Sequence, residues 1–242
     1  MKPILIQGAE NSEINYFLEI LKNKNEVEIG SFKFWTGEIF NLPIVVSRTK
    51  VGEINCAIAT TIGILKFEPR CIINQGTAGS HSIDIHRGDI IVGEKYVNIC
   101  NFQINYAEKG EYTNINRWNL KSYYSDDDKI ISNNADLKLI EILKIIKNNI
   151  DEKLIFGTIG SGDIWNREVD RILYLHEKYG TLCEDMETAG AYNTANSFGI
   201  PIIGIRIISN NEITSEKYNP ELSTDCQKFV EKVIKEIGKE IS

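Results

Sequence analysis

The sequence contains few of the residues that build metal sites and disulfide frameworks. Among its 242 residues are three histidines and five cysteines. The histidines, His81, His86 and His176, show no metal-ligand spacing and are expected to be isolated surface or loop residues. The cysteines include no C-x-x-C pair and are spread through predicted core segments, which predicts reduced, buried small hydrophobic residues: they are Cys56, Cys71, Cys100, Cys183 and Cys226. We therefore expect no metal site and no disulfide, and no cofactor, because no dinucleotide fingerprint is present.

The sequence also lacks an excess of positive charge and any long apolar run. Lys and Arg number 27 against 34 Asp and Glu, a formal net charge of −7, which argues against a nucleic-acid or anionic-membrane partner. No apolar stretch approaches the roughly 18 residues that a membrane helix needs. The apolar segment 2–6 is too short for a signal peptide. These absences predict a soluble, cytoplasmic protein whose partner is a small molecule.

Short apolar runs alternate with longer amphipathic stretches along the whole chain. Strands are predicted at 4–6, 32–34, 43–47, 71–74, 88–93, 154–159 and 201–208, with a short one ending at Cys183. Helices are predicted at 12–22, 52–65, 137–146, 168–179, 187–198 and 221–241. No linker interrupts this alternation, so we predict one domain over 1–242: a three-layer α/β/α fold with a twisted, mixed central sheet. The polar span 101–128 is predicted to be a long loop, suited to an active-site lid or a subunit contact.

Polar and glycine-rich segments follow six of the predicted strands. In open α/β sheets, ligands bind outside the carboxyl ends of the strands. That rule selects the segments after Ile6, Val46, Asn74, Ile159, Cys183 and Ile208. The candidate site is therefore assembled from pieces that lie far apart in the sequence.

Several residues in these segments have both an ordinary and a functional interpretation. The carboxylates of 184–187 can simply complement a helix N-terminus, or Glu187 can accept hydrogen bonds from a ribose diol while Met186 packs on the sugar. Trp165 can be a core residue or a surface on which a purine stacks. Glycines in 76–79 let backbone amides approach a ligand, and Glu13 can be a helix-start carboxylate or a site residue.

Taken together, these segments resemble one family. The motifs Gly8-Ala9-x-x-x-Glu13, Asn74-x-Gly76-Thr77-Ala78-Gly79, Gly88-Asp89-Ile90, Ser161-Gly162-Asp163, Asp185-Met186-Glu187-Thr188-Ala189 and Arg206-x-x-Ser209 occur in this order. They are similar to those of the methylthioadenosine/S-adenosylhomocysteine nucleosidases, within the purine nucleoside phosphorylase superfamily. The similarity extends from about Lys2 to Ser209.

This resemblance implies a fold, an assembly and a set of site residues. It implies a central sheet that partly closes into a barrel, and a homodimer or higher homo-oligomer. Glu13 would orient or deprotonate the attacking water, and Glu187 would hold the ribose hydroxyls. The remaining implied contacts surround the sugar and the base: Val51, Thr77, Ala78, Gly79, Trp165, the Asn166 backbone, Met186 and Ser209.

Asn210 departs from the nucleosidase pattern, which has aspartate after the serine. In that family the aspartate protonates N7 of the leaving purine, whereas an asparagine can only offer hydrogen bonds. An amide suits a 6-oxopurine, because its NH₂ can donate to O6 while its oxygen accepts from a protonated N7. With adenine the amide can pair with N6 and N7 but cannot deliver the proton. Asn210 therefore leaves the base open: it counts against adenine nucleosides and raises inosine, guanosine or another hypoxanthine-containing nucleoside. Glu212 is an alternative acid.

The cosubstrate can be argued from charge. The phosphorylases of this superfamily anchor phosphate with arginines, where this chain has Asn74-Gln75 before the glycine turn and Glu13 after the first strand. Arg48 is the remaining arginine near a strand end, and an ion pair or surface role suits it better. We therefore expect hydrolysis rather than phosphorolysis. The alternatives are a purine nucleoside phosphorylase and a non-catalytic storage or binding protein on the same scaffold.

Overall fold

The longest apolar, β-branched segments form neighbouring strands of one mixed sheet. In the computed structural model, which describes residues 1–112, 118–121, 131–132, 135–150 and 152–239, the sheet order is β11-β10-β6-β12-β5-β1-β4-β3-β2. β1 (Ile4–Gly8), β4 (Leu42–Arg48), β5 (Cys71–Ser80) and β12 (Ile202–Asn210) pair in parallel. They are largely buried, because helices cover both faces of the sheet.

One end of the sheet closes on itself. β6 (Ile90–Asn98) pairs with β12 and with β10 (Leu154–Ser161), and β10 pairs with β11 (Thr181–Asp185). β11 then pairs antiparallel with β5, so that β5, β12, β6, β10 and β11 form a closed ring. The predicted fold class, with its partial barrel, is confirmed.

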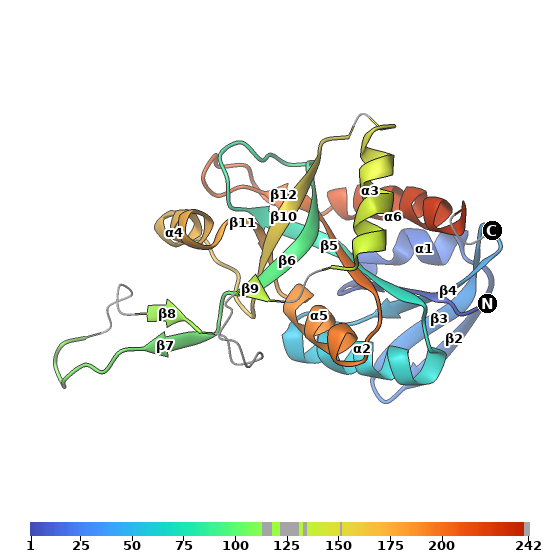
Figure 1. Ribbon diagram of the computed structural model, residues 1–242, viewed down its shortest axis with the longest axis horizontal. Coiled ribbons are helices and arrows are strands. Elements are labelled where there is room, and N and C mark those ends of the chain that lie inside the picture. Colours follow the sequence, from blue (N-terminus) through green and yellow to red (C-terminus); the bar gives the residue numbers. More distant parts are fainter. Residues whose placement is uncertain (113–117, 122–130, 133–134, 151, 240–242) are drawn as a thin grey trace.

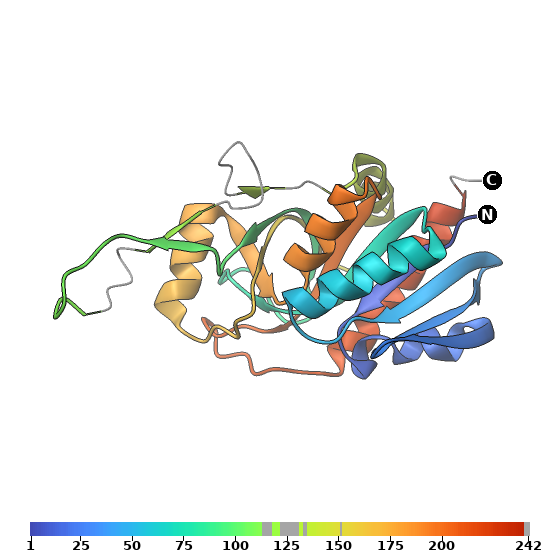
Figure 2. The same ribbon diagram turned by 90° about the horizontal axis from the view of Figure 1, so that it is seen from below.

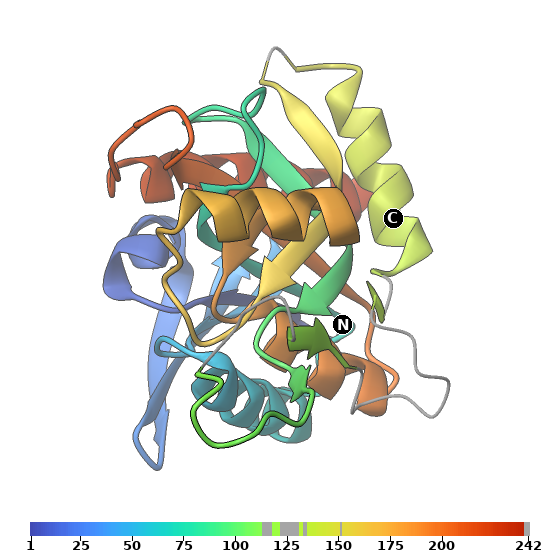
Figure 3. The same ribbon diagram turned by 90° about the vertical axis from the view of Figure 1, so that its left-hand side faces the viewer.

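Helices cover both faces of the sheet. α2 (Glu53–Phe67) and α5 (Thr188–Ser197) lie on one face, and α1 (Asn15–Ile20), α3 (Leu137–Lys147) and α6 (Leu222–Lys239) on the other (Figures 1 and 2). α4 (Val169–Tyr179) crosses in front of the barrel end (Figure 3). α2 and α5 approach closely because Gly190 has no side chain; a Cβ there would lie 2.3 Å from the Glu53 carbonyl oxygen. No helix in the described ranges is long and apolar enough to cross a bilayer.

The N-terminal hairpin differs from the prediction. The predicted helix 12–22 is a 3₁₀ turn (Asn11–Glu13) followed by the short α1, and Lys22 already begins a strand. That strand, β2 (Lys22–Ile29), is polar and mostly exposed, so hydrophobic periodicity gave no signal for it. It pairs with β3 (Phe32–Ile39), which is longer than the predicted strand 32–34.

Part of the predicted loop 101–128 forms a small separate sheet. β7 (Phe102–Ile104) pairs antiparallel with β8 (Trp118–Leu120), and the pair projects from the body of the molecule (Figures 1 and 2). β9 (Ile131–Ser132) pairs with β6. Residues 113–117 and 122–128 of that prediction, and the end of the predicted last helix at 240–241, lie outside the described residues. Lid and subunit-contact roles for the loop stay predictions.

Candidate active site

A cavity lies at the carboxyl ends of the parallel strands, where the strand-end rule places ligands. Every predicted site residue except Asn166 lines it: Glu13, Val51, Thr77, Ala78, Gly79, Trp165, Met186, Glu187, Ser209 and Asn210. Further lining residues are Ala9, Glu10, Ile164, Glu184, Asp185 and Tyr218. The fold thus brings together side chains that are up to two hundred residues apart in the sequence.

Glu13 is a buried carboxylate held by four donors. One oxygen accepts from the backbone N–H groups of Ala9 (2.8 Å) and Glu10 (3.3 Å). The other accepts from the Thr77 backbone N–H (2.9 Å) and hydroxyl (3.2 Å). Gly76 permits this approach, because a Cβ there would lie 2.7 Å from the carboxylate. The donors fix the carboxylate at the cavity wall, and the longer two contacts are those that a water or a ligand hydroxyl can replace.

Glu187 lies across the cavity at the start of α5. Its Oε1 accepts from the Gly52 backbone N–H at 2.9 Å. Burial raises the pKa of Glu187 to about 8, and the nearby Asp185 and Glu13 carboxylates add to this rise. This shift favours the protonated carboxyl group, which can both donate to and accept from a diol.

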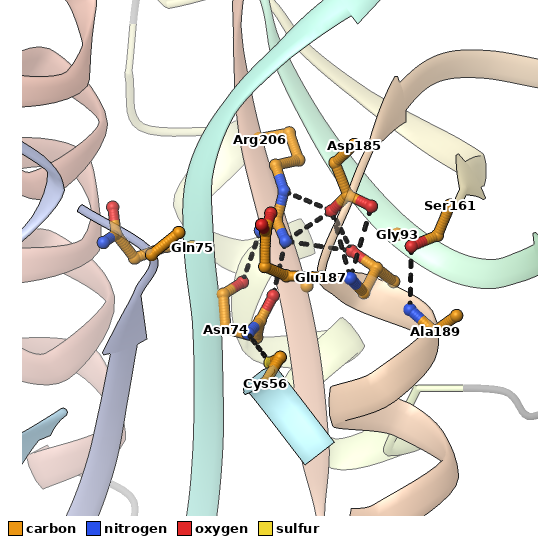
Figure 4. A network of polar contacts seen from close by, with 12 residues as sticks. Cys56, Asn74, Gln75, Gly93, Ser161, Asp185, Glu187, Ala189 and Arg206 are labelled. Atoms are coloured by element: carbon orange, nitrogen blue, oxygen red, sulfur yellow. Dashed lines mark hydrogen bonds and ion pairs between the residues drawn. The ribbon is translucent and has the colours of Figure 1, made fainter. Parts of the chain in front are cut away.

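Asp185 lines the cavity, and its carboxylate joins a network of polar contacts next to Glu187 (Figure 4). Its carboxylate accepts from Arg206 Nε at 2.6 Å and from Thr188. The Arg206 guanidinium also donates to the Asn74 carbonyl oxygen at 2.9 Å and to the Asn74 side chain. Arg206 is 1% exposed, so its charge is used to anchor Asp185 and the strand ends.

Two aromatic rings form the outer wall. Trp165 is 63% exposed, so its ordinary interpretation as a core residue is wrong. Its ring lies edge to face with Tyr218, with centroids 5.8 Å apart. Both residues line the cavity, leaving an indole face available for stacking. Tyr218 was missed from the sequence, since it lies in a segment between β12 and α6 that has no periodicity.

Asn210 is a buried amide at the end of β12. Its Oδ1 accepts from the Ser209 hydroxyl at 3.1 Å, and its Nδ2 lies 3.4 Å from Glu212 Oε1. The other Glu212 oxygen pairs with Arg167 at 3.2 Å. Glu212 is not among the residues lining the cavity, which weakens the alternative that it acts as the acid. Asn210 is therefore oriented, with its amide at the cavity wall.

His81 corrects one prediction. It lies in the loop after β5, as one of the predicted settings has it, but it is wholly buried and not isolated. Its Nδ1 lies 2.7 Å from the Thr181 hydroxyl, and its Nε2 lies 3.0 Å from Glu184 Oε2. The other Glu184 oxygen accepts from the Asn166 backbone N–H at 3.0 Å. The amide predicted to read the purine edge is thus bonded to a carboxylate here, and that carboxylate lines the cavity in place of Asn166.

The cavity is strongly acidic. The described residues that line it include five carboxylates and neither lysine nor arginine; the acids are Glu10, Glu13, Glu184, Asp185 and Glu187. Arg48, the candidate phosphate anchor, donates instead to the Asn11 side chain at 2.9 Å. Among the described residues, no group of three or more His, Cys, Asp or Glu is placed to hold a metal ion. The described chain offers a phosphate no cationic partner in this cavity.

Comparison with known proteins places this site in a family context. The Phosphorylase superfamily profile matches residues 3–241. The 5′-methylthioadenosine/S-adenosylhomocysteine nucleosidase of Buchnera aphidicola is 30% identical over 98% of both chains. The protein of the same name from Halalkalibacterium halodurans is 30% identical over 87% of this chain and 86% of its own.

Solved structures agree in fold. The Helicobacter pylori 5′-methylthioadenosine/S-adenosyl homocysteine nucleosidase, solved in complex with a substituted pyrrolidinol, superposes with a TM-score of 0.82 at 23% identity, covering 97% of this chain and 98% of that one. A futalosine hydrolase mutant from H. pylori gives a TM-score of 0.80 at 24% identity, covering 99% and 100%. The family profile, the full-length relatives and the shared fold together show that the chain belongs to the phosphorylase superfamily.

Proposed function

We propose that this protein hydrolyses the N-glycosidic bond of a purine nucleoside, with a 6-oxopurine as the preferred base. The observation that carries the proposal is the acidic lining of the cavity, with five carboxylates and no cation among its described residues. A phosphate dianion would be repelled there, whereas a neutral water and a ribose diol are compatible with it. The relatives named above are nucleosidases, a name that denotes hydrolysis, which supports the same reaction for this chain.

Charge development explains how this cavity would accelerate the cleavage. Breaking the C–N bond creates positive charge on the ribose and negative charge on the leaving base. Glu187 and Glu13 lie on the sugar side of the proposed pose, where carboxylates stabilise the positive charge more in the transition state than in the ground state. Burial and neighbouring carboxylates raise the pKa of Glu187, whereas a developing ribose cation next to it would favour the ionised form.

Glu13 is the group proposed to activate the water. The Thr77 hydroxyl contacts the same carboxylate oxygen, at 3.2 Å, and can rotate to share the water with it. A carboxylate base in this role typically contributes a factor of about 10²–10⁴. The water would then attack the anomeric carbon as the base departs.

Asn210 faces the opposite charge, on the departing base. When N7 takes up a proton from water as the bond breaks, the Asn210 NH₂ can donate to O6 while its oxygen accepts from N7–H. A 6-oxopurine offers this pairing and adenine does not. The amide is already oriented by Ser209 and Glu212, so little ordering is needed on binding. A hypoxanthine or guanine leaving group therefore fits this position better than adenine.

The proposal is tested by chromatography of the free base released from inosine, guanosine, adenosine, methylthioadenosine and S-adenosylhomocysteine in phosphate-free buffer. We expect release from the 6-oxopurine nucleosides above the rate for the adenine nucleosides. Release that requires phosphate would identify a phosphorylase instead. No release from any of these nucleosides, with or without phosphate, would contradict the proposal and favour the non-catalytic alternative.

A further inference from the structure

Glu184 has no assigned part in the proposed reaction, yet it is a buried carboxylate at the cavity. It is 7% exposed and lines the cavity beside Asp185 and Trp165. His81 holds one oxygen at 3.0 Å and the Asn166 N–H holds the other at 3.0 Å. Burying a carboxylate is unfavourable unless such partners compensate, so a buried carboxylate at a cavity suggests a role in binding.

Strand register places Glu184 directly opposite Asn210 across a gap. Gly79 of β5 pairs with Glu184 of β11 on one side and with Asn210 of β12 on the other. Paired residues on neighbouring strands direct their side chains to the same face of the sheet. Because Gly79 has no side chain, the face between the acid and the amide is open, and a Cβ at Gly79 would lie 3.4 Å from the Asn210 amide nitrogen.

The size and setting of this gap suit a planar base. Two strand spacings of about 4.8 Å separate the flanking strands, so Glu184 and Asn210 stand roughly 10 Å apart at the backbone. Trp165 precedes Asn166, whose N–H binds Glu184, and its exposed indole therefore lies at the same end of the cavity. A base stacked on Trp165 over Gly79 would direct one edge to Asn210 and the opposite edge to Glu184.

The chemistry of Glu184 selects what that second edge must carry. Each carboxylate oxygen has two acceptor sites, and His81 and Asn166 occupy one on each oxygen. The remaining sites are acceptors only. A 6-oxopurine presents an N1–H donor at this edge, joined in guanine by the 2-amino group, whereas adenine presents N1 as an acceptor that a carboxylate repels.

We propose that Glu184 is the specificity-determining residue for the base: it accepts the N1–H of a 6-oxopurine, while Asn210 binds the N7 and O6 edge. This inference rests on the proposed function and extends it from one edge of the base to both. His81 is then a positioning residue, which holds the Glu184 carboxylate in place through Nε2.

The test compares kcat/KM for inosine, 1-methylinosine and adenosine in the wild type and in Glu184→Gln. 1-Methylinosine keeps O6 and N7 but has no N1–H, so the wild type should cleave it about 10- to 100-fold less efficiently than inosine. Glu184→Gln should lower kcat/KM for inosine by a similar factor and raise the adenosine-to-inosine ratio, because the glutamine amide can donate to adenine N1. Glu231→Gln, a carboxylate on α6 that accepts from Tyr16, is the remote control and should change neither ratio.

Two further measurements separate an effect of Glu184→Gln on folding from an effect on base recognition. Glutamine can still accept from the Asn166 N–H and can donate to the other tautomer of His81, so the variant should melt within a few degrees of the wild type. Calorimetric binding of hypoxanthine and adenine reports base recognition without turnover.

Equal cleavage of inosine and 1-methylinosine by the wild type would overturn the role of Glu184 and leave the proposed function standing. Binding of hypoxanthine that depends on Glu184, without cleavage of any nucleoside, would support the role of Glu184 and overturn the proposed function. Neither binding nor cleavage of any purine would overturn both.

Discussion

At the scale of single residues, three of the carboxyl groups that line the cavity are accommodated in three different ways. Glu13 is held by four hydrogen-bond donors, and Asp185 by the buried Arg206 guanidinium. Glu187 has one backbone donor, and its pKa rises to about 8. Burial and the neighbouring carboxylates thus favour the protonated form of Glu187, and the described cavity lining contains no lysine or arginine.

The raised pKa of Glu187 leads to a prediction for the pH dependence of stability. The pKa of Glu187 is raised from 4.5 to about 8, so the folded state binds more protons than the unfolded state between these values, and stability falls as pH rises through that window. Glu187→Gln should therefore be more stable than the wild type at pH 9 and should show a flatter pH dependence. Burial and the nearby Asp163 carboxylate raise the pKa of Glu53 to about 7. Glu53 therefore also makes stability fall with rising pH, so the variant keeps part of the pH dependence. Thermal melting at pH 5, 7 and 9 measures this, with the exposed Glu19→Gln as control; an unchanged slope would mean that Glu187 is ionised in the folded protein.

The same variant should lose activity. The substituted glutamine would keep the position of the side chain but could not become the anion that the ribose cation requires, so kcat should fall by about 10²-fold or more. Steady-state base release from inosine at pH 7 provides the comparison. A kcat within a few-fold of the wild-type value would remove Glu187 from the reaction.

Asn210 sets a second residue-scale prediction. Asn210→Asp supplies a group that can carry a proton to N7, and it removes the NH₂ that donates to O6. The ratio of kcat/KM for adenosine to that for inosine should rise by about tenfold or more. Competing the two nucleosides in one reaction gives this ratio directly; a shift toward inosine would show that Asn210 does not face the purine as proposed.

At the scale of elements, the start of α2 joins the two ends of the cavity. The Asp163 carboxylate accepts from the Glu53 N–H at 2.8 Å and so caps α2 from the turn that leads to Trp165. One residue earlier, the Gly52 N–H donates to Glu187. Two consecutive backbone amides at the N-terminus of α2 therefore connect the turn after β10 with the start of α5.

Removing this cap should affect catalysis as well as stability. Asp163→Ala should cost about 1 kcal/mol of stability and lower kcat by about 10- to 100-fold, because Gly52 would no longer hold Glu187 in place. Asp136, which caps α3 by accepting from Lys138 and Leu139, is the matched control. Asp136→Ala should cost similar stability and leave kcat unchanged, and Asp163→Asn, which keeps an acceptor oxygen, should restore most of the activity. Equal kcat values in the two alanine variants would show that Asp163 only caps α2 and has no effect on catalysis.

The elements also show where sequence reasoning succeeds and where it stops. Buried parallel strands such as β4 and β12 were predictable because each is a continuous apolar run, and the strand-end rule then located nearly all of the site. β2 was not predictable, since it is polar and exposed. The contact of His81 with Glu184 was hidden because it depends on the antiparallel pairing of β11 with β5, which links residues a hundred positions apart and leaves no local periodicity.

At the scale of the whole molecule, α2 presents an apolar outer face that no described part of the chain covers. Ile54 (72% exposed), Ile58 (44%) and Leu65 (67%) recur at helical spacing along it. α2 itself lies on the outside of the sheet (Figure 2). Exposed apolar patches of this kind mark interaction surfaces. The homodimer expected from the sequence stays a prediction, and this face is where we expect the two copies to meet.

Light scattering tests that prediction. The wild type should have at least twice the mass of one chain, and Ile54→Glu should shift it toward the monomer by placing a charge in the contact. Leu137→Glu, at an equally exposed apolar position on α3, should leave the mass unchanged. A monomeric wild type, or a dimer indifferent to Ile54→Glu, would contradict this assignment of the interface.

The central claim concerns the reaction itself, and one measurement tests it most directly: the initial rate of hypoxanthine release from inosine in phosphate-free buffer, repeated with phosphate added. Since the described cavity lining holds five carboxylates and no cation, we predict release without phosphate, free ribose as the second product, and no acceleration on adding phosphate. Release only in the presence of phosphate, with ribose 1-phosphate as the product, would contradict the account.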